Sequence, residues 1–482
     1  MTLVHRVDFP QPISTLADYV RHRGGRGLEA ASSMTPDDII AVVLASGLRG
    51  RGGAGFPTGR KWRTVADMHS DEEATCVIVN AAEGEPGTFK DRHLLRTDPY
   101  HVIEGALIAA RAVQGSEIIF ALKKVNTIEH EILEGAIAEV IDAGWANGLS
   151  IRVATGPDEY LFGEESALLE VIDGRNPFPR IAPPYRRGVS EETSSSGLSA
   201  RVKMAGPGGG APALANNVET FANVAHIVAR GAEWFRTSGT SQSTGTFVCT
   251  ITGSTTREGV GEIRCGTPLT DVIAAIGGGM PEGRTIKAVL CGVSNRVITP
   301  ELLDSNVDYE TMQPLQVGPG SGGFIVFDDT IDMVAVAAGV ARFLAIESCG
   351  QCSPCKLDGL ELATKLTALC HNQASARDLE RIMGRLDTIT TGARCSLASQ
   401  QTITVGSILQ AFPADVAAHL DGTAVPVEPF LIAELRDVAN GVASWDDRHA
   451  SKQPDWSYDA TWSGKTPADL YTEHSGPNHL AD

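Results

Sequence analysis

Cys349, Cys352 and Cys355 stand at equal steps within seven residues of the chain. This spacing lets one short loop of backbone supply three corners of a metal-sulfur cluster, and it is a known ligand pattern for 4Fe-4S clusters. The fourth ligand then comes from a distant part of the chain, so the fold has to bring that part back to the loop. A zinc site or inert cysteines are the competing interpretations, but zinc motifs usually consist of two separated Cys-x2-Cys or Cys/His pairs. The spacing therefore predicts a 4Fe-4S cluster.

Two cysteines compete for the fourth ligand position. We select Cys395, which lies in the sequence Gly-Ala-Arg-Cys-Ser-Leu. Cys370 is the rival, but its apolar neighbours inside a helical pattern favour a buried thiol. In a chain of this size, cysteines outside such motifs are better interpreted as core thiols than as disulfides. The cysteines interpreted in this way are Cys76, Cys249, Cys265 and Cys291.

The bulk composition excludes several classes of protein. A formal net charge of -19 argues against nucleic acid as a partner, because that binding depends on clustered Lys and Arg. No uninterrupted apolar run reaches the roughly 18 residues that cross a bilayer, so we expect no direct membrane insertion. The opening residues show no secretory signal pattern. We expect a cytoplasmic protein, or one held at the inner face of the membrane through a complex.

The pattern along the chain predicts several domains, since 482 residues exceed the size of one hydrophobic core. Short apolar runs alternate with amphipathic segments over residues 76–174, which is typical of a layered α/β domain. From Thr330 onward we expect four helices and no strand, with a kink or break at Pro413. The expected divisions are an N-terminal segment (1–34), an α/β domain (35–240), a small domain of strands and helix (241–329), a four-helix domain (330–422) and a C-terminal extension of unknown role (423–482).

A glycine-rich stretch, residues 47–61, follows a predicted helix that Thr35 caps and Gly47 ends. Residues without a Cβ let backbone amides approach an anion closely. The stretch contains a literal G-x-G-x-x-G, but a dinucleotide fingerprint of that form needs a strand directly before it, and here a helix precedes. We interpret the stretch as a different kind of phosphate loop; a surface turn with solvated arginines is the alternative. The cationic side chains that support a phosphate are Arg49, Arg51, Arg60 and Lys61.

Two pairs of acidic residues follow predicted strands. Glu83 and Glu85 come after the buried strand 76–79, where α/β proteins usually bind ligands. Glu164 and Glu165 lie at another strand-to-helix junction. Two carboxylates at a strand end favour a polar ligand, although either pair could simply favour a helix N-terminus.

Together these stretches resemble the NADH-oxidising flavoprotein subunit of respiratory complex I and its relatives in NAD-linked hydrogenases and formate dehydrogenases. The resemblance spans residues of about 35 to 422. Several separate motifs occur in the same order as in that family, which makes coincidence implausible. They are the glycine loop 47–59, Glu-Pro-Gly-Thr-Phe-Lys-Asp-Arg at 85–92, Gly-Glu-Glu at 163–165, Asn-Asn-Val-Glu-Thr at 216–220, Gly-Ser-Gly-Gly at 320–323 and Glu-Ser-Cys-Gly-Gln-Cys-Ser-Pro-Cys at 347–355.

The resemblance implies a Rossmann-like FMN-binding domain, a small β-grasp (soluble-ligand-binding, ubiquitin-like) domain and a C-terminal four-helix iron-sulfur domain. It implies that NADH stacks on Phe56 and is held by Glu85 and Glu165. Hydride transfer needs no general acid or base, so Glu85, Glu165 and Tyr160 are expected to orient the reactants and set the local charge. The residues implied to contact FMN are Gly50, Gly52, Lys61, Asn80, Glu83, Tyr160, Gly163, Glu164, Asn216, Asn217 and Thr220.

This sequence departs from the family pattern at a few positions. Ala82 and Gly84 stand where the family usually has an aspartate and a serine. On the adenine side, the departures are Thr64, Ala182 and Tyr185. NADPH is an alternative substrate, because Arg186 and Arg187 next to Tyr185 suit a 2'-phosphate.

An electron that reaches one cluster has to leave it, and the sequence contains no second cysteine cluster. The resemblance therefore implies a partner: a small 2Fe-2S subunit, a larger iron-sulfur or catalytic subunit, or a ferredoxin. The competing function is a non-catalytic electron-relay subunit whose flavin receives electrons from a partner and whose nucleotide site has lapsed. The replacements on the adenine side are the support for that alternative.

Overall fold

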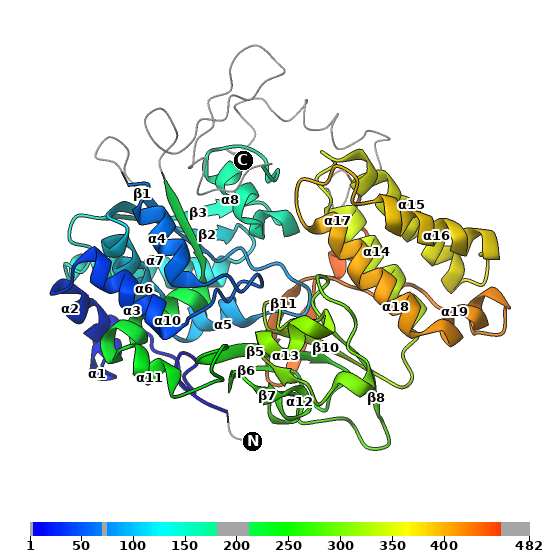
Figure 1. Cartoon of the computed structure of the whole chain (residues 1–482), viewed down its shortest axis with the longest axis horizontal. Helices are drawn as coiled ribbons and strands as arrows, with labels where there is room; N and C mark the ends of the chain where they lie inside the picture. Colours follow the sequence, from blue (N-terminus) through cyan, green and yellow to red (C-terminus); the bar gives the residue numbers. More distant parts are fainter. Residues whose placement is uncertain (1–2, 70–74, 181–211, 455–482) are drawn as a thin grey trace, which may run out of the picture.

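The computed structural model describes residues 3–69, 75–180 and 212–454 of the chain (Figure 1). Its first part is an α/β unit built on a four-stranded sheet in the order β3-β2-β1-β4. All neighbouring strands in this sheet run parallel, which confirms the predicted α/β class. The strands are β1 (Thr75–Asn80), β2 (Gly115–Lys123), β3 (Ser150–Gly156) and β4 (Ala213–Asn217).

Both faces of the parallel sheet are buried, as its apolar strands require. Val77 and Val79 pack into the large core on one face, whereas Cys76 and Ile78 pack into a second cluster on the other face. The elements of this part are α1 (Leu16–Arg21), α2 (Arg26–Ser32), α3 (Pro36–Ser46), α4 (Thr58–Ala66), α5 (Lys90–Thr97), α6 (Pro99–Ala112), α7 (Thr127–Asp142), the 3₁₀ turn η1 (Tyr160–Gly163), α8 (Glu165–Ile172), α10 (Val218–Arg230) and α11 (Ala232–Arg236).

Helix α3 has the ends that the sequence predicts. Thr35 and Asp38 form a capping box with Pro36 in the first turn, and Gly47 ends the helix in the left-handed conformation with φ 74°. The glycine loop therefore starts directly at a helix end.

The second part is a mixed four-stranded sheet in the order β6-β5-β10-β8. β5 and β6 form an antiparallel hairpin, β10 runs parallel to β5, and β8 is antiparallel to β10. Helix α12 packs on the sheet through Leu269, Val272 and Ile273. The elements are β5 (Thr246–Gly253), β6 (Gly259–Arg264), β7 (Thr267–Pro268), α12 (Leu269–Gly277), β8 (Ile286–Cys291), η2 (Pro300–Leu302), β9 (Asn306–Val307), α13 (Tyr309–Met312), η3 (Gln313–Leu315) and β10 (Gly323–Asp328).

The third part is helical and lies on the opposite side of the molecule from the parallel sheet (Figure 1). Pro413 starts a new helix, as predicted, and the helix upstream of it, which is continuous from Leu397 to Ala411, contains a π-helical turn at Gln401–Val405. The helices are α14 (Met333–Glu347), α15 (Ser353–Cys370), α16 (Ala376–Thr388), α17 (Leu397–Gln400), the π turn η4 (Gln401–Val405), α18 (Gly406–Ala411) and α19 (Pro413–Leu420).

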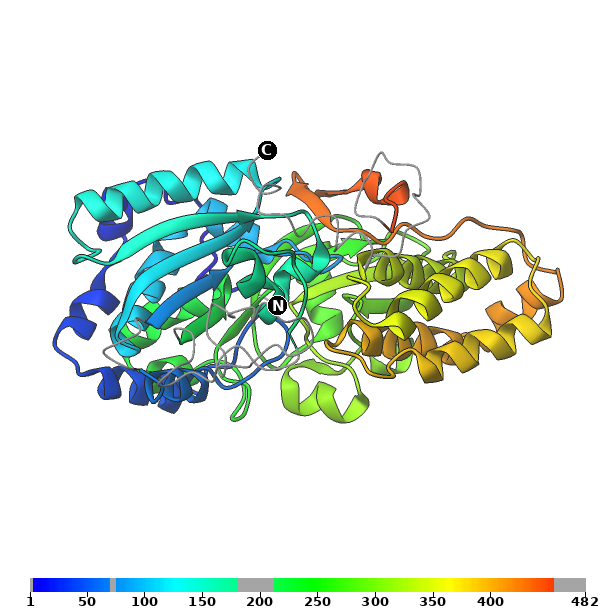
Figure 2. The same ribbon diagram turned by 90° about the horizontal axis from the view of Figure 1, so that it is seen from above.

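The expectation of no strand after Thr330 is wrong. β11 (Leu435–Ala439) and β12 (Val442–Trp445) form an antiparallel hairpin, and a 3₁₀ turn, η5 (Asp447–Ala450), follows. Asn440 and Gly441 make the turn, both with positive φ, which is the conformation that a tight hairpin turn requires. The chain thus returns from the helical part toward the parallel sheet (Figure 2). None of the helices in the described ranges is long and apolar enough to cross a membrane.

Two helix glycines give a test of this packing. A Cβ on Gly105 of α6 would lie 1.9 Å from the carbonyl oxygen of Phe221 on α10, whereas a Cβ on Gly135 of α7 would meet nothing within 4 Å. Gly105→Ala should therefore lower the free energy of unfolding by about 1–3 kcal/mol. Gly135→Ala should raise it by about 0.4–1 kcal/mol. Urea unfolding of both variants measures the difference, and equal midpoints would contradict the close α6–α10 contact.

Candidate functional site

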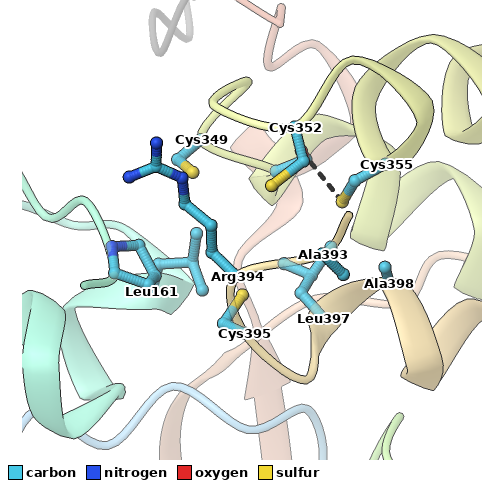
Figure 3. Close-up of a pocket in the computed structure, with 11 residues that line it drawn as sticks. Leu161, Cys349, Cys352, Cys355, Ala393, Arg394, Cys395, Leu397 and Ala398 are labelled. Carbon is cyan, nitrogen blue, oxygen red and sulfur yellow. Dashed lines mark hydrogen bonds between the residues drawn. The ribbon is translucent and has the colours of Figure 1, made fainter. Parts of the chain in front are cut away.

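The four predicted cluster ligands surround one cavity (Figure 3). Cys349 and Cys352 lie on the loop between α14 and α15, Cys355 lies in the first turn of α15, and Cys395 lies just before α17. Cys370 is fully buried at the other end of α15 and does not line the cavity. The fold therefore brings together the three equally spaced cysteines and the distant one that we select as the fourth ligand.

The spacing of these cysteines and the cavity that they line suit an iron-sulfur cluster. Among the residues that the structure describes, no three His, Cys, Asp or Glu side chains converge closely enough to hold a single metal ion. Burial raises the pKa of Cys355 to about 11 and that of Cys395 to about 12. Only a strongly electrophilic centre would hold such thiols as thiolates.

The cysteine loop is held by its neighbours. The buried ammonium of Lys356 donates hydrogen bonds to the carbonyl oxygens of Ala345, Ile346 and Ser348, at 2.7, 3.2 and 3.0 Å. These bonds satisfy carbonyls at the end of α14 that the helix leaves without partners. Gln351 accepts a hydrogen bond from Arg394 at 3.0 Å, which ties the loop to the segment that carries Cys395. None of these side chains received a role from the sequence alone.

The glycine loop lies at the carboxyl edge of the parallel sheet. The amide of Gly50 donates to the carbonyl of Phe56 at 2.9 Å and closes the loop. Gly55 has φ 62°, and a Cβ there would collide with the ring of Tyr309. Helix α4 follows without any side-chain cap; its Thr58 amide donates to the Leu48 carbonyl at 2.9 Å, and the remaining amides of its first turn are available to an anion. Phe56 is 55 % exposed on this loop, which suits a stacking role.

The charged residues of the loop divide into two groups. Lys61 extends to Glu165 on α8, with 2.6 Å between the ammonium and the carboxylate. Arg51, by contrast, is fully buried: its guanidinium lies over the Phe247 ring at 4.1 Å and donates to the Thr244 carbonyl. The expectation that Arg51 adds charge for a phosphate is therefore wrong, because this side chain faces the second sheet.

Polar residues implied to contact FMN gather where β1 and β4 end. Asn80 and Asn217 are partners across these strands, and the Asn80 amide donates to the Gly163 carbonyl at 2.9 Å. Asn216 accepts a hydrogen bond from the Trp62 indole at 2.9 Å. Thr220 accepts one from the amide of Arg51 at 2.9 Å. This edge of the sheet is the usual ligand position in open α/β folds.

A buried network lies beneath this edge, and its members come from two of the motifs quoted above, residues 85–92 and 216–220. The ammonium of Lys90 lies 2.7 Å from Asp91, 3.0 Å from Glu219 and 3.0 Å from the amide oxygen of Asn217. Burial opposes the charge on Lys90, but Asp91 and Glu219 outweigh it and raise the pKa of Lys90. The network therefore holds Asn217 in one orientation.

The acidic residues have different roles in the structure. Glu83 is buried and accepts hydrogen bonds from the Asp91 amide and the Arg92 guanidinium, both at 2.9 Å. Glu164 caps α8 by accepting a hydrogen bond from the Ala167 amide at 2.8 Å. This is the alternative role stated above for the acidic pairs, in which a carboxylate stabilises a helix N-terminus.

Glu85 connects three parts of the molecule. It accepts from the Tyr160 hydroxyl and from the Val293 amide, both at 2.7 Å. Burial raises the pKa of Glu85, and these hydrogen bonds offset part of that rise. Gln400 on α17, which was not predicted as a site residue, donates to the same Tyr160 hydroxyl at 3.0 Å. Tyr160 thus joins the acidic loop to the helix that follows Cys395.

Comparison with known proteins gives two family matches. Residues 43–226 match the model of the Nuo51 FMN-binding domain. Residues 335–419 match that of the NADH-ubiquinone oxidoreductase-F iron-sulfur binding region. An NADH-quinone oxidoreductase subunit of Rhizobium meliloti is 33% identical over 435 residues, which are 88% of this chain and 98% of the relative. The chain belongs to the NADH-ubiquinone oxidoreductase-F family.

Further relatives in this family are hydrogenase subunits. The NADP-reducing hydrogenase subunit HndC of Solidesulfovibrio fructosivorans is 33% identical, with 86% of this chain and 82% of that protein covered. Among solved structures, an NAD+-reducing [NiFe]-hydrogenase in the H2-reduced state has a TM-score of 0.73 at 33% identity and covers 87% of this chain and 68% of that chain. The family thus includes chains from different redox complexes, and its FMN-binding and iron-sulfur regions are both present here.

The choice of the fourth ligand can be tested by paired substitutions. Cys395→Ser should lose most of the bound iron and acid-labile sulfide, because a 4Fe-4S cluster needs its fourth thiolate. Cys370→Ser should keep the wild-type content, since that thiol is remote from the cavity. Iron and sulfide per chain, with the EPR spectrum of the dithionite-reduced protein, provide the measurement. Loss in Cys370→Ser together with retention in Cys395→Ser would show that the ligand set is wrong.

Proposed function

We propose that this chain is the NADH-oxidising entry module of a larger redox complex. The observation that carries this proposal is that one turn, η1, belongs to both sites. Its Tyr160 hydroxyl bonds to Glu85 and Gln400, its Leu161 lines the cysteine cavity, and its Gly163 bonds to Asn80. The nucleotide-side carboxylates and the cluster ligands are thereby adjacent, which is what electron transfer between two cofactors requires.

FMN and a 4Fe-4S cluster fit the residues present. When bound, FMN would supply an acceptor for the hydride of NADH and a donor of single electrons, and the cluster would supply a one-electron acceptor. The glycine loop and the uncapped first turn of α4, with Lys61, would hold the phosphate. Asn80, Gly163, Asn217 and Thr220 would contact the rest of FMN. Cys349, Cys352, Cys355 and Cys395 would hold the cluster.

The remaining proposed residues orient the nucleotide. The exposed ring of Phe56 would stack on NADH, and Glu85 and Glu165 would accept hydrogen bonds from it. Lys61 neutralises Glu165 in the structure and would be shared with a bound phosphate. Tyr160 holds the Glu85 carboxylate in place through a 2.7 Å hydrogen bond. None of these groups has to exchange a proton for hydride transfer.

The domain divisions expected from the sequence are part of this proposal. The order β6-β5-β10-β8, with a parallel central pair and α12 on one face, supports a β-grasp domain over residues 241–329. Helices α14 to α19 support a four-helix iron-sulfur domain over residues 330–422. The α/β unit supports an FMN-binding domain over residues 35–240.

A partner has to accept the electrons. Outside the cavity, the remaining cysteines are buried in apolar cores: Cys76 in that of the parallel sheet, Cys249, Cys265 and Cys291 together in that of the second sheet, and Cys370 in that of the helical part. None of them belongs to a spaced motif like that of residues 349–355. We propose an iron-sulfur partner, either a small 2Fe-2S subunit, a larger iron-sulfur or catalytic subunit, or a ferredoxin. The chain would then work in the cytoplasm or at the inner membrane face, attached through that partner.

The non-catalytic relay and the NADPH alternative depend partly on residues outside the described ranges. Ala182, Tyr185, Arg186 and Arg187 all lie there, and Thr64 is half-buried on α4 with its hydroxyl bonded to the Arg60 carbonyl. Anaerobic mixing of the FMN-loaded protein with each nucleotide discriminates between the possibilities. We expect NADH to bleach the flavin absorbance and then to produce the EPR signal of a reduced cluster. Bleaching by NADPH alone would show the other substrate, and inertness to both would leave the relay function.

Substitution of Phe56 tests the nucleotide site itself. Phe56→Ala should raise KM for NADH by about threefold to tenfold and leave kcat nearly unchanged, because a stacking contact stabilises bound substrate and transition state alike. Ile128→Ala is the matched control, since Ile128 is a similarly exposed apolar side chain, 53 % exposed, on α7. Steady-state kinetics with ferricyanide as acceptor measure both. An unchanged KM in Phe56→Ala would contradict the proposed stacking.

A further inference from the structure

The chain after α19 forms a strap across the molecule. We use the term C-terminal strap for residues 423–454, which lie beyond the iron-sulfur family match ending at residue 419. The Phe430 amide bonds to the Ala335 carbonyl on α14, and the strap then crosses toward the parallel sheet (Figure 2). There the Leu435 carbonyl accepts a 2.7 Å hydrogen bond from Arg92, and Arg436 pairs with Asp158 at 2.6 Å. The strap therefore contacts both the helical part and the α/β part.

Near the end of the strap, the side chains of Lys452 and His449 contact a buried pair of carboxylates, Glu347 and Glu159. The Lys452 ammonium lies 2.7 Å from Glu347 and 2.8 Å from Glu159, and His449 lies 3.0 Å from the same oxygen of Glu347. All four side chains are buried, and Lys452 is only 1 % exposed. Two buried carboxylates need such partners, because an unpaired buried charge is strongly unfavourable.

Glu347 links the cysteine loop to the turn that carries Tyr160. Its position in the sequence is two residues before Cys349, at the end of α14. Its second carboxylate oxygen accepts a 2.9 Å hydrogen bond from the amide of Tyr160. Glu159, the other carboxylate on Lys452, directly precedes Tyr160. Lys452 thus connects the start of the cysteine loop with the start of the turn that carries Tyr160.

The strap is itself fixed at this place. Arg342 on α14 donates to the carbonyl oxygens of His449, Ala450 and Lys452, at 2.8, 2.8 and 3.1 Å. These bonds fix the backbone on both sides of the inserted side chains. The arrangement has the form of a second layer around a metal site, in which outer partners orient the ligands.

We propose that Lys452 and His449 of the C-terminal strap are positioning residues, which hold the Glu347 carboxylate so that the Tyr160 turn and the cysteine loop keep a fixed relative position. This inference rests on the proposed function, since it assigns the strap to the passage of electrons between the two sites. Changes in these two residues should therefore alter the rate of electron transfer to the cluster and the EPR spectrum and midpoint potential of the cluster. They should have little effect on hydride transfer, because neither residue contacts the glycine loop or Phe56.

Lys452→Met removes the shared cation and keeps the length of the side chain. We expect flavin bleaching by NADH at the wild-type rate, followed by cluster reduction that is slower by about 10- to 100-fold, the usual effect of losing an outer-shell partner. The EPR spectrum and midpoint potential of the cluster, poised with dithionite, should shift. Lys452→Arg should restore the wild-type values, because guanidinium keeps the charge.

Asp437→Asn is the matched control. Asp437 lies on the same strap and pairs with Arg96 at 2.7 Å, but it contacts neither Glu347 nor Glu159. It should leave the rate of cluster reduction and the EPR spectrum unchanged. If Lys452→Met does not fold, as shown by thermal unfolding, His449→Gln is measured in its place, because it removes one partner of Glu347 and keeps Lys452.

The outcomes separate this inference from the proposed function. The inference would be overturned if Lys452→Met and His449→Gln both kept the wild-type EPR spectrum, midpoint potential and rate of cluster reduction. An equal change in Asp437→Asn would also overturn it, since the effect would then belong to the whole strap and not to its contact with Glu347. Failure of NADH to bleach the wild-type flavin would contradict the proposed function, whereas the dithionite-poised EPR measurement would still decide the role of Lys452.

Discussion

The hydrogen bonds of one short turn, Tyr160–Gly163, connect the two functional sites. Glu85 and Gln400 hold the Tyr160 hydroxyl, and Glu347 holds the Tyr160 amide. A 3₁₀ turn of this length has almost no internal stabilisation, since such turns have poorer hydrogen bonds than an α-helix. Its geometry therefore depends on the three parts of the chain that surround it. This dependence explains why residues far apart in sequence converge on a single tyrosine.

The second sheet packs against the glycine loop through the side chain of Arg51. Arg51 leaves the loop and lies buried over Phe247 of β5, and Glu219 accepts a 2.9 Å hydrogen bond from the Val248 amide. Glu219 also pairs with the fully buried Lys90. Removing one partner of such a buried pair typically costs about 3–5 kcal/mol, because the other charge is left without compensation. The small sheet thus fixes the loop through the Phe247 ring and the Val248 amide, and Glu219 compensates the charges of Lys90 and Arg51.

Local signals in the sequence predicted the parts of this structure that local physics determines. The caps of α3 and the break at Pro413 follow from backbone and capping preferences, and the cysteine spacing follows from cluster geometry. Arg51 could not be assigned correctly, because nothing in a glycine-rich loop shows that one of its arginines turns inward. Gln400 carries no local signal, since its contact with Tyr160 spans 240 positions. The β11–β12 hairpin was predictable from its Asn440-Gly441 pair, which is a strong hairpin signal.

The strap also gives a physical reason for one departure from the family pattern. A Cβ at Gly84 would lie 2.8 Å from the ammonium of Lys123 and 3.0 Å from the carboxylate of Glu434. Lys123 ends β2 and is fully buried, so it needs the carboxylate that Glu434 brings from the strap. A serine at position 84 would require the ends of these two side chains to shift. Glycine at position 84 lets the pair that anchors the strap lie directly against the backbone of the acidic loop.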